Sequence, residues 1–336
     1  MTTAHIEREN SRRAEEAVRA VLPRSVKARR GSRDGVDLVV GGVSIEMKWA
    51  GEGWLGDIRP VLASKRRPDV VVARQMSPGA REALSQAGIG WVDETGAAEI
   101  AKGSIVISRS GRPLTIASRS ERWTPSVLAT AEALLCGVRA TTAAVQEATG
   151  LSTGSCTHAL KLLTKLALLT ADAARGRASG RRVVDQRRLL EAYATAAAEL
   201  PEAPALQVGV TWRDVITGLT AVGTLWNTEQ VEWAATGAAA AAVLAPYLTS
   251  VTTGEAYVDA KTTAQLVAVA RAARLQPIEG GRLTLRPFPT VTTSRLAEQR
   301  DGLWVAPWPR VYVDLRGSGV RGEEAAEHLR EVIHGR

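Results

Sequence analysis

The sequence predicts an α+β protein of several domains. Strand-like and helix-like runs alternate over residues 1–116, helices dominate residues 125–198, and mixed character returns over residues 205–336. Such alternation is typical of α/β units with a mixed sheet. The 336 residues suffice for two or three domains, each with its own core. We therefore expect a mixed-sheet α/β domain, a central helical domain and a C-terminal α/β domain.

The composition favours a cytoplasmic protein with a polyanionic partner. Apolar residues make up 45% and charged residues 23% of the chain, and no apolar run approaches the length of a membrane span. No signal peptide is visible, and Cys136 and Cys156, both expected to be buried, indicate reduced thiols. The formal net charge of +8 points toward a polyanionic partner such as nucleic acid, because Lys and Arg gain affinity by releasing its condensed counterions, and no membrane partner is expected.

The N-terminal domain is expected to begin with a helix. Ala14, Ala17, Val18 and Val21 recur at helical spacing, and Pro23 ends the pattern. Short apolar runs then predict strands, with one helix between the third and the fourth. The strands are expected at residues 36–40, 43–48, 70–73, 90–92 and 105–107, and the helix at residues 78–87.

A hairpin is predicted around the dipeptide Gly41-Gly42. Two glycines tolerate the positive φ values that a two-residue hairpin turn requires. Pairing across this turn sets Val40 opposite Val43 and Leu38 opposite Ile45. The resulting ribbon has one wholly apolar face and one polar face.

The polar face of this hairpin is a candidate metal site. Asp37 is expected opposite Glu46, with Lys48 beside them, and two facing carboxylates repel each other unless a cation such as Mg²⁺ lies between them. The spacing resembles the PD-(D/E)XK nucleases, although Val36 stands where proline is common. The resemblance implies catalytic roles for Asp37, Glu46, Lys48 and the helical Glu15, with Mg²⁺ on Asp37 and Glu46. The alternatives are a solvated hairpin or a fold that only binds DNA.

The central domain contains a helix-turn-helix pattern. Helices are expected at residues 126–136 and 141–149, followed by the turn Gly150-Leu151-Ser152, in which the serine hydroxyl caps a third helix. That helix buries an apolar stripe made of Cys156, Ala159, Leu160 and Leu163. With the cap residue Ser152, the residues expected to face DNA are Thr153, Thr157, His158, Lys161 and Lys165.

A basic hairpin follows the third helix. It carries Arg175 and Arg177 near its tip and Arg181 and Arg182 on its second strand. Three helices followed by a basic hairpin resemble the winged-helix family of bacterial regulators. The resemblance implies that these arginines contact the backbone or minor groove of double-stranded DNA. The alternatives are a small helical bundle with a solvated basic loop and a winged helix used for protein contacts.

The C-terminal segment predicts an Ala-rich helix at residues 237–244, strands at residues 256–258 and 311–314, and a closing helix at residues 322–334. Four features of this segment resemble the abortive-infection-E type IV antitoxins. They are Thr236-Gly237 before the Ala-rich helix, Tyr247, Tyr257-Val258-Asp259 and the run that begins at Pro309. That resemblance implies a nucleotidyltransferase-like domain, repression of the protein's own operon and a cognate toxin partner. The chain lacks the Ser and the Asp-x-Asp pair of a working nucleotidyltransferase, which favours a scaffold or partner-binding domain.

The leading hypothesis is a DNA-binding regulator or antitoxin-like repressor. The alternative is a Mg²⁺-dependent endonuclease targeted by the winged helix, and a third hypothesis is a protein-binding adaptor. Winged-helix proteins often bind paired half-sites as dimers, so a homodimer is a further hypothesis.

Overall fold

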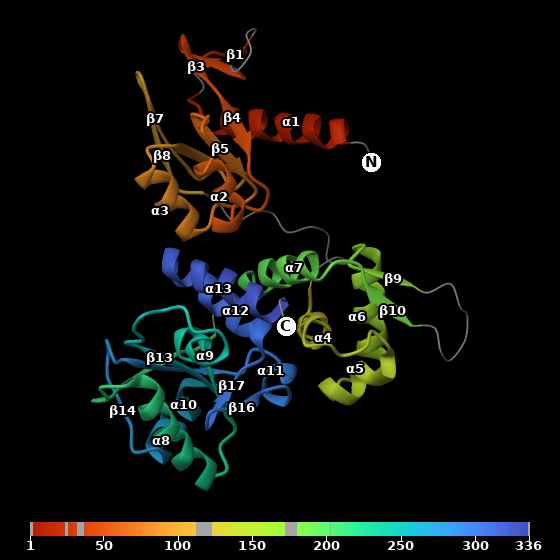
Figure 1. Ribbon diagram of the computed structural model, residues 1–336, viewed down its shortest axis with the longest axis vertical. Coiled ribbons are helices and arrows are strands. Elements are labelled where there is room, and N and C mark those ends of the chain that lie inside the picture. Colours follow the sequence, from red (N-terminus) through yellow and green to blue (C-terminus); the bar gives the residue numbers. More distant parts are fainter. Residues whose placement is uncertain are drawn as a thin grey trace. The chain divides into compact units, whose positions relative to one another are not determined.

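The computed structural model describes residues 3–23, 26–31, 37–111, 123–171, 180–201 and 203–334. The chain divides into two compact units, the first formed by Met1–Ile116 with Ser318–Glu324 and the second by Ala117–Gly317 with Ala325–Arg336. Helices and several sheets, some of them mixed, occur together, which confirms the α+β class (Figure 1).

The first unit is built on two sheets. The larger has the order β4-β5-β6-β7-β8, with β4, β5 and β6 parallel and the later neighbours antiparallel, so it is mixed as expected. Its strands are β4 (Met47–Trp49), β5 (Val70–Ala73), β6 (Gly90–Asp93), β7 (Ala98–Lys102) and β8 (Ile105–Arg109). The smaller, antiparallel sheet joins β1 (Ala28–Arg30), β2 (Leu38–Val40) and β3 (Val43–Ile45).

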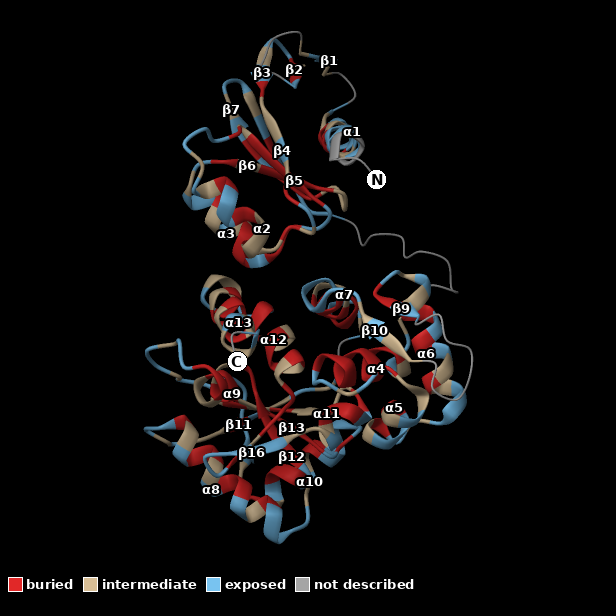
Figure 2. Ribbon diagram, turned by 45° about the vertical axis from the view of Figure 1, so that its right-hand side comes forward, coloured by how far each residue is buried: buried red, intermediate tan, exposed pale blue. Residues whose placement is uncertain are grey.

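Helices cover both faces of the larger sheet. Helix α1 (Thr3–Val21) packs against β4, β5 and β6, while α2 (Leu55–Leu62) and α3 (Pro78–Gln86) pack together on the other side (Figure 2). Side chains alternate between the two faces of a strand. Accordingly, Val70 and Val72 of β5 join the core under α1, and Val71 and Ala73 join the core under α2 and α3. A fully buried β5 explains why this apolar run predicts a strand so clearly.

The predicted hairpin is present, but its second strand is interrupted. The pairs Leu38–Ile45 and Val40–Val43 confirm the expected register. The ladder then ends at Glu46, which separates β3 from β4. The Glu46 N–H donates to the Asp69 carboxylate at 2.8 Å, and the Glu46 carbonyl accepts from the N–H of Val70 at 3.1 Å. The expectation of one strand over residues 43–48 is therefore wrong, because at Glu46 the chain passes from one sheet to the other.

The second unit begins with helices. They are α4 (Pro125–Leu135), α5 (Thr142–Thr149), α6 (Thr153–Lys165) and α7 (Gln186–Ala198), and the antiparallel pair β9 (Leu169–Ala171) and β10 (Arg181–Val183) lies between the last two. Every residue of α4 from Val127 to Leu135 is buried. A helix is buried all round only when it has neighbours on every side. Helix α4 packs against α5, α6 and α7 and also against α11 and α12 of the C-terminal part.

A seven-stranded mixed sheet forms the rest of this unit, in the order β14-β11-β15-β13-β12-β17-β16. Its strands are β11 (Leu206–Gly209), β12 (Trp233–Thr236), β13 (Gly254–Val258), β14 (Gln276–Pro277), β15 (Leu283–Pro287), β16 (Glu298–Arg300) and β17 (Leu303–Val305). The accompanying helices are α8 (Val215–Thr228), α9 (Gly237–Leu244), α10 (Thr263–Ala272), α11 (Val291–Arg295), α12 (Trp308–Arg316) and α13 (Gly319–His334), whose residues from Ala325 belong to this unit. Helices α8 and α10 pack together, as do α9 and α12.

Two sequence-based expectations are wrong in this unit. Residues 311–314 form part of helix α12 and not a strand, because Pro309 lies in the first turn of the helix and Val311, Tyr312 and Leu315 form its buried face. Packing of that face outweighs the preference of valine for strands. Cys156 is buried as expected, but Cys136 is exposed, since it is the C-cap residue at the end of α4.

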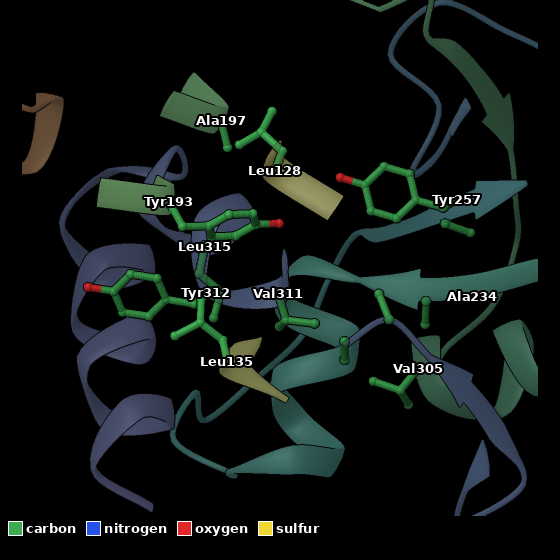
Figure 3. Packing of buried hydrophobic residues seen from close by; sticks show 14 of the residues in the cluster. Leu128, Leu135, Tyr193, Ala197, Ala234, Tyr257, Val305, Val311, Tyr312 and Leu315 are labelled. Atoms are coloured by element: carbon green, nitrogen blue, oxygen red, sulfur yellow. The ribbon is translucent and has the colours of Figure 1, made fainter. Parts of the chain in front are cut away.

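The helices of residues 125–198 share one core with the C-terminal sheet. Figure 3 shows Leu128 and Leu135 of α4 beside Tyr193 of α7 and Val311 of α12, in the same cluster as Val305 of β17. In the described part of the chain, no helix has the length and apolar character needed to span a bilayer.

Candidate nucleic-acid interface

The turn between α5 and α6 has the expected conformation. Gly150 ends α5 with a φ of 70°, a left-handed value that glycine adopts without strain. The Ser152 hydroxyl accepts a hydrogen bond from the N–H of Ser155 at 3.2 Å, which caps α6. The roles expected for both residues are confirmed.

Helix α6 presents an apolar face to the core and a polar face to solvent. Cys156, Ala159, Leu160 and Leu163 are buried, as their spacing predicts. On the opposite side His158, Lys161 and Lys165 are exposed, and Thr157 is half-buried. The helix contains no aspartate or glutamate. Its outer face is therefore cationic, with no acid within the helix to neutralise it.

The first residues of α6 are small. Ser152 and Thr153 are exposed, and an added Cβ on Gly154 would meet nothing closer than 3.9 Å. The Thr153 hydroxyl donates to the Gln146 side chain of α5 at 3.0 Å. This bond fixes the Thr153 side chain against α5 and leaves the start of α6 sterically open.

The side chains of the two arginines of β10 have different surroundings. Neighbouring residues of a strand point to opposite faces, and the Arg181 guanidinium turns back onto α6, where Nε donates to the Thr164 hydroxyl at 3.2 Å. Arg182 is exposed and lies opposite Thr170 of β9. Arg181 is thus engaged by α6 whereas Arg182 is exposed, and DNA contact by either arginine stays a prediction. Arg175 and Arg177 lie outside the described residues.

Sequence reasoning missed another cation beside this ribbon. The Arg181 N–H donates to the Ala140 carbonyl at 3.3 Å, so the loop before α5 pairs with β10. Arg139, the residue before Ala140, is exposed. Only a contact between residues far apart in sequence brings Arg139 to the ribbon, so no local pattern could have identified it.

The four residues of the proposed nuclease motif each have a defined place in the first unit. The Asp37 carboxylate accepts from the Met47 N–H at 2.7 Å, and Glu46 forms an ion pair with Arg66 at 3.1 Å. Lys48 is exposed and has no ion-pair partner among the described residues. The expected pairing of Asp37 with Glu46 across the hairpin is not formed, because the ladder stops one pair earlier.

Glu15 of α1 is neutralised by two arginines. It accepts from Arg30 at 2.6 Å and from Arg19 at 2.9 Å. Burial alone would raise the pKa of Glu15, but these hydrogen bonds outweigh it and lower that pKa below its ordinary value. Arg30 and Arg19 thus provide the positive charge that a metal ion would otherwise supply.

A carboxylate that the sequence analysis did not single out lies between α4 and α11. Glu132 is fully buried, and its carboxylate accepts from the hydroxyls of Thr293 at 2.8 Å, Thr290 at 3.0 Å and Tyr193 at 3.2 Å. Burial raises the pKa of Glu132 to about 7, although the hydroxyl hydrogen bonds oppose this shift. The adjacent Thr292 hydroxyl donates to the Ala129 carbonyl at 3.0 Å. These bonds join α4 to the C-terminal part of the unit.

Asp314 is part of a second buried polar network at the end of β12. It accepts from Tyr257 at 2.7 Å and forms an ion pair with Arg310, and the Thr236 hydroxyl donates to it. Gly237 follows with a φ of 58°. The carboxylate of Asp314 is thus satisfied by protein groups, as a structural role requires.

Comparisons with protein-family models, with curated proteins and with solved structures found no match to this chain.

Proposed function

We propose that the protein binds double-stranded DNA through the outer face of α6 and acts as a transcriptional regulator or antitoxin-like repressor. The observation that carries this proposal is the composition of that face. A side-chain hydroxyl caps the helix, its first turn is small and open, and Lys161 and Lys165 are exposed with no acid in the helix. In this reading residues 125–198 form a winged helix, with β9 and β10 as the base of its wing.

The arrangement of α6 suits the major groove. Recognition helices contact base edges with residues near their N-terminus and phosphates with flanking cations. Ser152, Thr153 and Thr157 would lie at the base edges, and Lys161 and Lys165 at the phosphates. His158 is also exposed and lies between these two sets.

The packing of α6 against α4 favours a recognition helix whose position is fixed before it binds DNA. Helix α4 contacts α6 on one side and α11 on the other, and the Glu132 hydrogen bonds hold it there. A recognition helix that is fixed in advance loses little conformational entropy on binding. The C-terminal sheet therefore has a mechanical role in this proposal, and it is also the candidate surface for a toxin or other protein partner.

DNA cleavage is the second candidate, and the geometry favours it less. A PD-(D/E)XK site would use Asp37 and Glu46 to hold Mg²⁺, with Lys48 and Glu15 beside them. The carboxylates of Asp37, Glu46 and Glu15 are each bonded to an N–H group or a guanidinium. No group of three His, Cys, Asp or Glu side chains placed to hold a metal ion occurs among the described residues. These residues do not fit Mg²⁺ as they are placed, and we derive no step through it.

Fluorescence anisotropy with a labelled duplex tests DNA binding directly. Lys161→Ala should weaken binding and lower the slope of log K against log salt by about 0.9, the value for one lost phosphate contact. Lys261→Ala is the matched control, because Lys261 is also an exposed lysine of the second unit but lies outside the helices of residues 125–198. Equal losses for both variants, or no binding by the unmodified protein, would contradict the proposal.

Incubation of supercoiled plasmid with the protein and Mg²⁺ or Mn²⁺ separates the two candidates. The DNA-binding proposal expects intact plasmid. Nicking that disappears in Lys48→Ala, while binding in the anisotropy assay persists, would favour the nuclease.

A further inference from the structure

A cavity of about 450 Å³ lies in the second unit, away from the outer face of α6. Its walls come from the segment that joins α8 to β12, from the segment around Phe288, from the end of α11 and from β17. Small-molecule sites in proteins usually have volumes of roughly 300–1,000 Å³. The cavity is therefore large enough for a small organic ligand.

Aromatic rings form much of the cavity lining. Trp233 is buried, whereas Trp304 and Phe288 are half-buried and line the same cavity. The Trp233 indole N–H donates to the Asn227 side-chain oxygen at 2.9 Å, which fixes both side chains. The Asn227 amide nitrogen has two N–H donors and its oxygen has a second lone pair, and these groups can bond a ligand.

Polar groups complete the lining. Gln230 is exposed, with no recorded side-chain hydrogen bond among the described residues. Glu232 accepts from the Ser294 hydroxyl at 2.9 Å and has further acceptor capacity. Glu232 and Arg295 carry opposite charges, so the lining is neutral overall.

We propose that this cavity binds a nucleoside. A planar base suits the rings of Trp304 and Phe288, and the amides of Asn227 and Gln230 supply donors and an acceptor for its edge. The Glu232 carboxylate can accept from ribose hydroxyls. A hydrocarbon ligand would leave these polar groups without partners, and a phosphorylated ligand would meet Glu232 as well as Arg295.

Arg295 lines this cavity and also lies against the end of α5, directly before the proposed DNA-binding helix α6. The Arg295 guanidinium lies at the end of α5, where an added Cβ on Gly150 would be only 2.6 Å from Arg295 Nη1, and Nη2 lies 3.5 Å from the Glu147 carbonyl. Gly150 sets the direction in which α6 begins. A ligand that moves Arg295 therefore changes the α5–α6 turn, and we infer that nucleoside binding alters DNA affinity. This second step rests on the proposed function.

Calorimetric titration of the full chain with adenosine, inosine, cytidine and uridine tests the ligand class without DNA. At least one nucleoside should bind with a Kd below about 1 mM, and Trp304→Leu should weaken it about tenfold or more. Trp308→Leu is the matched control, because Trp308 is also half-buried in this unit but does not line the cavity. Gln230→Glu, which changes hardly any volume, should weaken the same nucleoside at least about threefold. Failure of all four nucleosides to bind below about 1 mM, or equal losses for both tryptophan variants, overturns the proposal.

The coupling is tested by DNA affinity at a saturating concentration of the nucleoside found by calorimetry. The Kd for DNA should change at least about threefold in the unmodified protein and stay unchanged in Arg295→Gln. Nucleoside binding without any change in DNA affinity overturns the coupling but not the site. If the protein binds no DNA, the calorimetric result still decides whether the site exists, so the two proposals fail separately.

Discussion

The charged side chains of the nuclease-like motif in the first unit and those of helix α6 in the second unit differ in their partners. In the first unit Glu15, Asp37 and Glu46 each have a cation or an N–H group as partner. Helix α6 has Lys161 and Lys165 on its outer face and no acid at all. Both regions carry residues that a sequence motif singles out, the nuclease-like motif in the first unit and the helix-turn-helix pattern in the second.

The contrast shows that Glu15, Asp37 and Glu46 are already engaged by protein groups, whereas the Lys161 ammonium has no ion-pair partner within the part of the chain that the structure describes. An acid that is already bonded to arginine gains little from a metal ion, because the metal must first displace that partner. Lys161, an exposed lysine with no ion-pair partner among the described residues, needs no such displacement before it meets a phosphate. The net charge of +8 therefore says less about where an anionic partner would bind than the positions of individual cations do.

The largest effect is expected at Glu132, the buried carboxylate of the second unit. Its pKa is raised from 4.5 to about 7, so between these pH values the folded protein binds the proton and the unfolded chain does not. Stability should fall as pH rises through this window, by about 3 kcal/mol in total, and level off above it. Calorimetric melting at several pH values measures this slope. Glu132→Gln should flatten it, and the exposed Glu199→Gln should not. Equal slopes in all three proteins would show that Glu132 ionises normally.

Charge reversal compares the two regions directly. Lys161→Glu should weaken DNA binding roughly 10- to 100-fold, about 1.4–2.7 kcal/mol, because a phosphate contact becomes a repulsion. Lys48→Glu in the first unit should change the Kd by less than about threefold. Anisotropy at one fixed salt concentration measures both variants. A larger effect for Lys48→Glu would reverse the assignment of the DNA-binding surface.

A pair of glycines tests how firmly the turn before α6 is held. Gly150 and Gly137 both have positive φ, but only at Gly150 does a neighbour, Arg295, approach an added Cβ. Each alanine substitution should lower the free energy of unfolding by about 1–2 kcal/mol, because alanine is strained at a positive φ. Gly150→Ala should lower the free energy of unfolding slightly more than Gly137→Ala, because Arg295 Nη1, the far end of a flexible side chain, must also shift. Equal melting temperatures for the two variants would mean that Arg295 gives way freely.

The smallest effect concerns magnesium. Because Asp37 and Glu46 are already bonded, Mg²⁺ should leave the melting temperature unchanged to within about 1 °C at concentrations near the physiological range. Asp37→Asn, which keeps one acceptor oxygen for the Met47 N–H, should cost less than about 1 kcal/mol. A Mg²⁺-dependent rise in melting temperature that Asp37→Asn abolishes would show that Asp37 binds the metal ion. It would contradict the conclusion that the acids of the first unit are already satisfied by protein groups.

Local patterns were sufficient for several parts of this fold. The spacing of Cys156, Ala159, Leu160 and Leu163 predicts the buried face of α6, and the Gly41-Gly42 turn predicts the hairpin register. In both cases neighbours in sequence determine the geometry. Even the separation of Arg181 from Arg182 was predictable, because adjacent residues of any strand face opposite ways.

Contacts between distant residues account for what the sequence did not reveal. The strand break at Glu46 depends on Asp69, and the position of Arg139 depends on pairing with β10. Helix α12 forms where valines favour a strand, because its apolar face packs against α7 and α9. The cavity lining combines residues from four separate segments and carries no local signature.

The burial of α4 on all sides has a consequence for how this protein can change. A fragment ending before the C-terminal sheet would expose to water the sides of α4 that pack against α11 and α12. Such a fragment should aggregate, so we expect that residues 125–198 cannot be transferred to another protein as an independent domain. Under the proposed function, a new DNA specificity would instead require substitutions on the outer face of α6, which leave the packing of α4 unchanged.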